Sequence, residues 1–260
     1  MPERSLEGLA LSSKPLGEND RLLTLLSDQE GLTRLAVPGA RKPKSSLAAA
    51  VPLAHLRLQV GGGSGLHRVR QLKVVRHYGQ LGQRLETLAA AQALAELCLA
   101  LVPADSAAPG MLATVLLQLG RLEELLKACG PNSEALAIAV QGSVHLLALG
   151  GYALPLAHCC RSGEPLEPPI GNWEWRCSLV PSEGLAIGAI AGARVVLNAS
   201  ELALLQRLLR PHLPRRRDGE LMGPEGVWLH LLDLVESWCS EHLGRRPRAF
   251  KLLRTGFGAS

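Results

Sequence analysis

The sequence predicts an α+β fold, in which a five-stranded β-barrel is followed by an α-helical domain with an irregular, cysteine-containing insert. Three observations support this prediction. Residues 1–78 contain short apolar runs separated by turn residues. From Gly82 onward, apolar residues recur at helical spacing. The 260-residue chain is 47% apolar but only 3% aromatic, which favours packed helices over an aromatic-rich β-sandwich.

In the N-terminal domain, residues 1–78, the alternation of apolar and polar residues is clearest at 55–60. Period two puts three residues in the core and three in solvent: Leu56, Leu58 and Val60 against His55, Arg57 and Gln59. The glycine-rich residues 61–65 supply a flexible loop into the next strand. The candidate strands are 22–26, 32–37, 55–60 and 66–75, with 8–11 a possible first strand. Five short antiparallel strands fit an oligonucleotide-binding (OB) barrel, whose loops and one face commonly carry nucleic acid.

The second domain, residues 79–260, is predicted to be a helical bundle. Asn198 and Glu201 have the spacing of a capping box that opens a helix. We expect residues 151–193, rich in Pro and Gly, to be irregular, and the basic tail 245–260 to be half ordered. Trp228 and Trp238 lie on apolar stripes and are predicted to be core residues. The expected helices are 83–101, 111–129, 133–149, 199–210 and 225–243.

Positive charge is concentrated in one segment of the chain. Residues 31–85 hold ten Arg and Lys and no Asp or Glu, so the rest of the chain is net −5 although the whole chain is +5. A single-sign field of this size indicates a polyanionic partner; a solvated basic surface and an acidic membrane are the alternatives. The predicted DNA-binding residues are Arg34, Arg41, Lys42, Lys44, Arg57, Arg68, Arg70, Lys73 and Arg76. No aromatic residue precedes Tyr78, so binding should be directed at phosphates and tolerant of sequence.

The sequence lacks the motifs of several enzyme classes. It has no P-loop, no GxGxxG, no nucleophile elbow and no HExxH, and the basic segment has no carboxylates to hold the metals of a nuclease. We therefore predict a binding protein and not an enzyme. The longest apolar stretch, 89–102, is shorter than the roughly 18 residues that a spanning helix needs. Since the N-terminus also has no secretory signal, the chain is expected to stay in the cytoplasm and to bind no membrane.

Six cysteines are present, and three of them lie in the irregular segment. His158, Cys159, Cys160 and Cys177 are residue types that zinc prefers, but Ser162 stands where a CxxC pair needs its second thiol. We therefore predict no bound metal and no other cofactor. The two cysteines within apolar helical patterns, Cys98 and Cys239, are predicted to be unreactive thiols. They are called the helix-core thiols below.

Residues 17–26 (GENDRLLTLL), Gly31 and residues 39–45 (GARKPKS) resemble, in order and spacing, the N-terminal barrel of the RecO family of DNA repair proteins. The similarity continues through Gly151 and Tyr152 and on to the closing helices. It implies an OB barrel, a helical domain, binding of single- and double-stranded DNA at the nucleoid, and annealing of complementary strands. It further implies help, together with RecR, in loading RecA onto DNA coated by single-strand-binding protein (SSB). Many members of the family carry a CxxC pair twice, and this chain departs from that pattern because residues 186–189 contain no cysteine.

Three questions stay open at this level. The polar cluster at residues 18–21 is expected to form a salt bridge at the start of a strand, with partner contact as the alternative. A rival function is a helical adaptor for other repair or RNA-handling proteins, in which the basic barrel is incidental. A metal-dependent nucleic-acid enzyme is a third possibility, and it would require bound zinc with an open coordination position.

Overall fold

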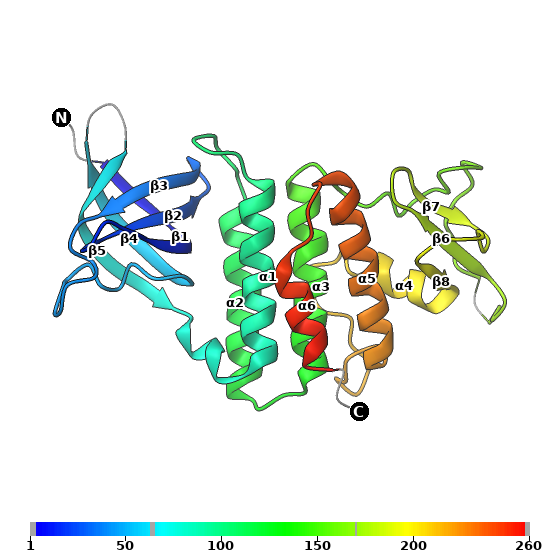
Figure 1. The fold of residues 1–260 in the computed structure, drawn as a ribbon. Helices are drawn as coiled ribbons and strands as arrows, with labels where there is room; N and C mark the ends of the chain where they lie inside the picture. The colour runs from blue at the N-terminus through cyan, green and yellow to red at the C-terminus, as the bar shows by residue number, and fades with distance from the viewer. Residues whose placement is uncertain (1–3, 63–65, 170, 258–260) are drawn as a thin grey trace.

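The computed structural model describes residues 4–62, 66–169 and 171–257. A barrel lies at one end, a bundle of long helices occupies the middle, and a small sheet lies at the other end (Figure 1). The fold class is therefore the α+β class that the sequence predicts.

The barrel is closed and has the strand order β1-β2-β3-β5-β4. All neighbouring strands are antiparallel except β3 and β5, whose short parallel contact closes the barrel in the OB manner. All five predicted strands are present. The first is much longer than the predicted range 8–11, and the last extends two residues beyond the predicted range 66–75. Their bounds are β1 Arg4–Leu16, β2 Asp20–Ser27, β3 Gly31–Val37, β4 Ala54–Gly61 and β5 His67–His77. The predicted loop between β4 and β5 includes residues 63–65, which lie outside the described residues.

The alternation in β4 places side chains largely as the sequence predicts. Leu56, Leu58 and Val60 are buried in the barrel core, and Arg57 is exposed on the outer face. His55 differs from the prediction, because only 12% of its side chain is exposed. Its burial lowers the pKa of the imidazole, an effect only partly opposed by the Glu7 carboxylate on β1.

The helical domain begins with a 3-10 turn, η1 (Gly79–Gln83), and its core is built around α1 and α3. Both helices are apolar on most sides, which is typical of helices at the centre of a bundle. Trp228 and Trp238 are buried, as predicted. The bounds of the long helices are α1 Leu85–Leu101, α2 Met111–Lys127, α3 Asn132–Leu149 and α5 Glu225–His242. None of the described helices is long and apolar enough to cross a membrane.

The expectation that residues 151–193 are irregular is wrong in part. This region contains two strands, β6 (Arg176–Val180) and β7 (Gly184–Ile187), which form a three-stranded antiparallel sheet with β8 (Val196–Asn198). The strands are only three to five residues long, and Cys177, Ser178 and Leu179 in β6 are all buried, so no alternation appears in the sequence. Helix α4 (Ala199–Arg207) follows β8 directly and opens on the predicted Asn198–Glu201 capping box.

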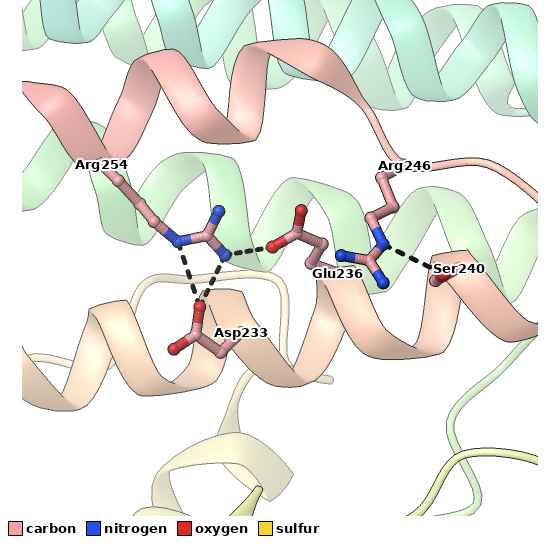
Figure 2. Close-up of polar contacts among 5 residues, drawn as sticks. All are labelled: Asp233, Glu236, Ser240, Arg246 and Arg254. Carbon is pink, nitrogen blue, oxygen red and sulfur yellow. Dashed lines mark hydrogen bonds and ion pairs between the residues drawn. The ribbon is translucent and has the colours of Figure 1, made fainter. Parts of the chain in front are cut away.

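The basic tail is also more ordered than expected, because residues 248–255 form helix α6 (Arg248–Thr255). Ala249, Phe250 and Leu253 bury one face of α6 in the main core, and the helix packs on α1. Polar contacts hold it to α5 as well (Figure 2). Arg254 donates through Nε and Nη2 to Asp233 Oδ1, at 3.1 and 2.6 Å, and also pairs with Glu236. Ahead of the helix, Arg246 Nε donates to Ser240 Oγ at 3.1 Å.

The barrel and the helical bundle share a tight junction. At the start of β3, Gly31 has φ +62°, and a Cβ there would lie 2.2 Å from the Ser106 carbonyl oxygen. Asp28 Oδ1 accepts a hydrogen bond from the backbone N–H of Leu112 at 2.8 Å, in the first turn of α2. Buried Leu9 and Leu26 of the barrel belong to the same apolar cluster as α1 and α2. The junction therefore fixes one side of the barrel against the helices.

Candidate nucleic-acid interface

The loop between β3 and β4, residues 38–53, carries three positive charges within four residues, the closest grouping in the barrel. Two hydrogen bonds to the loop backbone hold its first half, one from the Asp20 side chain at the start of β2 and one from the Asn19 backbone in the β1–β2 turn. Asp20 Oδ1 accepts from the Gly39 N–H at 2.8 Å, and the Asn19 carbonyl accepts from the Arg41 N–H at 2.9 Å. The salt bridge expected at residues 18–21 is therefore wrong, because the Asp20 carboxylate binds the loop backbone instead.

The second half of the same loop is held by side chains of β1 and β2. Arg21 Nη1 donates to the carbonyls of Ala48 and Ala50, both at 3.2 Å, and Ser13 Oγ donates to the Ala50 carbonyl at 3.0 Å. Ala50 is buried, and these hydrogen bonds give its carbonyl partners from outside the loop. The β1–β2 hairpin thus sets the conformation of the whole loop.

Three of the predicted DNA-binding residues, Arg41, Lys42 and Lys44, project from this loop and are exposed. Arg41 Nη1 donates to the Gly17 carbonyl at 3.0 Å, which fixes the direction of the guanidinium. Lys44 has φ +58°, a left-handed conformation that marks a tight turn at this point of the loop. The loop therefore presents its cations to solvent from a backbone that is held in place.

The other six predicted residues lie on the strands, and all are exposed. Arg57 on β4 stands next to Lys73 on β5 in the strand register, so these two strands present neighbouring cations. Their positions are Arg34 on β3, Arg57 on β4, and Arg68, Arg70, Lys73 and Arg76 on β5.

Two of these strand cations are paired with carboxylates from outside the basic segment. Arg57 donates through Nε and Nη2 to Glu7 Oε2 on β1, at 2.8 and 2.6 Å, and this hydrogen bonding lowers the pKa of the Glu7 carboxyl. Arg76 pairs with Glu123 on α2. The assumption that every charge of the basic segment is uncompensated is therefore wrong for Arg57 and Arg76.

Within the described residues, seven of the nine predicted DNA-binding side chains have no ion-pair partner. This set is called the free barrel cations: Arg34, Arg41, Lys42, Lys44, Arg68, Arg70 and Lys73. Tyr78, the first aromatic residue of the chain, is 2% exposed and lies beneath the Arg76 guanidinium, 5.2 Å from its ring centroid. The barrel therefore offers charge for phosphates but no exposed aromatic ring for bases.

Sequence reasoning missed two cations that lie beside this loop. Lys14 on β1 and Arg21 on β2 line a cavity of about 270 Å³ together with Arg41. Both lie outside the acid-free segment that directed the prediction. The sequence signal that could have found them is the hairpin around Gly17. Its antiparallel register places Lys14 and Arg21 at the same end of the β1–β2 pair.

The cysteine segment does not have the geometry of a zinc site. Cys159 Sγ accepts from the backbone N–H groups of Ser162 and Ile187, at 3.4 and 3.3 Å. Burial acts to raise the pKa of this thiol, but these hydrogen bonds outweigh it and lower the pKa to about 7. Burial raises the pKa of Cys177 to about 12.

In the part of the chain that the structure describes, no group of three or more His, Cys, Asp or Glu side chains could hold a metal ion. The residues present do not fit a tetrahedral zinc, because Ser162 replaces the second thiol of the CxxC pair and the described residues bring no third and fourth ligand to Cys159. The absence of bound zinc stays a prediction. The helix-core thiols are buried, and this burial raises the pKa of each to about 12.

The sequence matches two family models that together span most of the chain. The model described as "Recombination protein O N terminal" matches residues 1–78, and "Recombination protein O C terminal" matches residues 82–249. The DNA repair protein RecO of Prochlorococcus marinus (strain MIT 9313) is 65% identical over 254 residues, 97% of this chain and 95% of that protein. That of Synechococcus sp. (strain WH7803) is 63% identical over 259 residues, covering 99% and 96%. The RecO of Trichodesmium erythraeum is more distant, at 29% identity over 269 residues, covering 95% and 92%.

Proposed function

The chain belongs to the RecO family of DNA repair proteins, and from this premise we propose that it binds single- and double-stranded DNA through phosphate contacts on the barrel. The observation that carries the proposal is the loop of residues 38–53. Its cations are exposed, while its backbone is fixed by Asp20 and Arg21 of the neighbouring hairpin. Cations on a fixed backbone lose little conformational freedom when they bind a phosphate.

Phosphate binding also accounts for strand annealing. Two complementary single strands repel each other through their phosphates, and cations that neutralise part of this charge lower the repulsion. Since no aromatic side chain is exposed on the described barrel, the bases of a bound strand are not held by stacking and stay available for pairing. We therefore propose that the protein anneals DNA without catalysing a covalent reaction.

The wider repair role is part of the same proposal. A protein that binds single strands without reading bases can act at any damaged site, which suits a recombination mediator. Its proposed partners are RecR and SSB, and its proposed outcome is the loading of RecA onto SSB-coated DNA. With these partners, we expect the protein to act in the cytoplasm, at the nucleoid.

The test is a charge reversal confined to the loop. The variant Arg41→Glu, Lys42→Glu and Lys44→Glu leaves the barrel core untouched, so its melting temperature should stay near that of the parent. If about half of the seven free barrel cations contact phosphate, the log of affinity for single-stranded DNA should fall with log salt at a slope of about −2 to −3 in the parent. In the variant, DNA binding and annealing should be lost.

A matched control reverses three exposed charges on the helical domain, in the variant Arg216→Glu, Arg217→Glu and Lys251→Glu. It changes the net charge by the same amount but leaves the barrel unchanged, so its binding should weaken far less than that of the loop variant. Normal annealing and an unchanged salt slope in the folded loop variant would refute the proposal. That outcome would favour the adaptor function, in which the helical domain carries the activity.

A further inference from the structure

A cavity of about 270 Å³ lies where the β1–β2 hairpin meets the loop of residues 38–53. Three of its lining residues are cations, Lys14, Arg21 and Arg41, and no carboxylate lines it. Like charges gathered around one cavity repel each other, and an anion in the cavity would relieve this repulsion. The composition of the lining therefore points to an anionic ligand.

The two arginines are fixed by the protein but keep donors available. Arg21 and Arg41 each use Nη1 to bind backbone carbonyls, those of Ala48 and Ala50 for Arg21 and that of Gly17 for Arg41. Among the described residues, neither Nε nor Nη2 of these arginines has a protein partner. A guanidinium held in this way is preorganised for a planar, two-point contact with phosphate oxygens.

Lys14 is the third cation of the lining, and it comes from β1, the strand that pairs with the β2 strand of Arg21. Its side chain is exposed, and no hydrogen bond or ion pair to another described residue engages its ammonium group. The nearest acid of the adjoining turn, Asp20, is committed to the Gly39 N–H and does not line the cavity. Nothing in the lining therefore neutralises the Lys14 charge.

We infer that this cavity is a phosphate subsite, in which Lys14, Arg21 and Arg41 bind one phosphate group of a DNA strand. The inference rests on the proposed function, and it extends the DNA-binding surface from the acid-free segment onto β1 and β2. Arg21 has two tasks in this site, since one edge of its guanidinium supports the loop and the other faces the ligand. Lys14 contributes charge alone, which makes it the residue to test.

The experiment measures binding of an oligothymidylate of fixed length to the full chain over a range of salt concentrations. Lys14→Gln removes one of the three cations around the bound phosphate, so affinity should fall several-fold at low salt and the magnitude of the log–log salt slope should fall, by at most about 0.7, whereas Lys14→Arg should keep the parent affinity and slope. Lys251→Gln, at an exposed position of α6, which belongs to the helical bundle and not to the barrel (Figure 1), is the matched control and should also keep the parent slope. Because Lys14 is exposed, none of these variants should lose its fold.

A second measurement locates the contact without relying on affinity. The lysine amines are acylated in the presence and absence of the oligothymidylate, and the extent of modification is read by mass spectrometry. Lys14 should be protected by the oligonucleotide, and Lys251 should not. An unchanged salt slope in Lys14→Gln, or equal modification of Lys14 with and without DNA, would overturn the subsite.

Failure of the subsite can be told apart from failure of the proposed function. If the Arg41, Lys42 and Lys44 reversal abolishes DNA binding while Lys14→Gln keeps the parent slope, the barrel binds DNA but the cavity takes no phosphate. If both variants keep the parent slope, the barrel is not the DNA site and both proposals fall.

Discussion

Arg76 is predicted from sequence to bind DNA, but the structure gives it a different task. It is the penultimate residue of β5, and its guanidinium donates to the carboxylate of Glu123 on α2. That carboxylate is 2% exposed, and its other oxygen accepts from Gln80 Nε2 at 2.5 Å. The Arg76 side chain also lies over the ring of Tyr78. Arg76 therefore joins the barrel to the helical domain.

Replacing Arg76 by Gln should lower the free energy of unfolding by about 2 kcal/mol. The loss of a charged hydrogen bond to a buried carboxylate is worth about 1.5 to 3 kcal/mol, and loss of the contact with the Tyr78 ring adds about 0.5 kcal/mol. The upper range for buried ion pairs does not apply, because 48% of the Arg76 side chain is exposed and water can replace part of the contact.

Urea unfolding of the parent, Arg76→Gln, Glu123→Gln and the double variant forms a double-mutant cycle. The two single changes should be strongly non-additive, with a coupling energy of about 1 kcal/mol or more. Arg76→Gln should leave the salt slope of DNA binding unchanged. Arg70→Gln, at an exposed position of the same strand without an ion-pair partner, should lower the magnitude of the slope by about 0.7 and keep the parent stability. A coupling energy below about 0.5 kcal/mol, or a slope change in Arg76→Gln equal to that in Arg70→Gln, would refute the assignment.

Four further predictions concern other parts of the molecule. Glu7→Gln should free Arg57 for DNA, steepening the salt slope by about 0.7 and raising affinity at low salt; an unchanged titration would argue against this. The hydrogen bond with Glu201 raises the pKa of His230 above its ordinary 6.5, so the pair should stabilise the fold below that pH and lose this effect as pH rises through the raised pKa. The parent should therefore melt at a higher temperature than His230→Gln, and this difference should be larger at about pH 5.5 than at about pH 9. The same difference at both pH values would contradict this. The helix-core thiols should react with a thiol reagent only on unfolding, and metal analysis of the purified protein should find no stoichiometric zinc; fast native labelling or one equivalent of zinc would oppose these expectations.

The parts of the fold that were predictable from sequence are those in which local pattern and burial agree. Residues 55–60 alternate because one face of β4 packs in the barrel, and the helices show the spacing of their buried faces. The second half of β1 was hidden because its residues, Ser12, Ser13 and Lys14, are polar and lie past an irregularity in the pairing with β2. Pairing with a neighbouring strand, and not local composition, makes this segment a strand.

The small sheet and α6 were missed for a related reason. β6, β7 and β8 are too short to show a period, and their pairing joins segments separated by turns that are rich in Gly and Pro. In α6, Phe250 and Leu253 are spaced for a helix, but the surrounding Arg and Lys suggested a solvated tail. Packing on α1 and the Arg254 contacts to α5 stabilise this helix, and neither is visible in the local sequence.

The charge pattern along the chain identifies a basic, exposed region but overestimates the number of its unpaired cations. A sum of charges over one segment ignores the carboxylates that the fold brings to it from other parts of the chain. Glu7 pairs with Arg57 across 50 residues of sequence, and Glu123 pairs with Arg76 across 47. The same reasoning overlooked cations that the fold adds to the region, namely Lys14 and Arg21. A prediction from sequence can therefore identify a basic surface, but only the pairing of distant strands shows which of its charges are available.

The residues that carry the family resemblance have divided roles, and this division would let the surface bind phosphates in a fixed arrangement, as proposed. In the first group, Asp20 and Arg21 bind the backbone of the loop, whereas in the second group Arg41 and Lys42 face solvent. An acidic residue next to the proposed DNA-binding loop would weaken binding if it contacted the ligand, but the Asp20 carboxylate accepts from the Gly39 N–H and does not line the cavity of Lys14, Arg21 and Arg41. The acid therefore supports the loop that presents the proposed phosphate-binding cations.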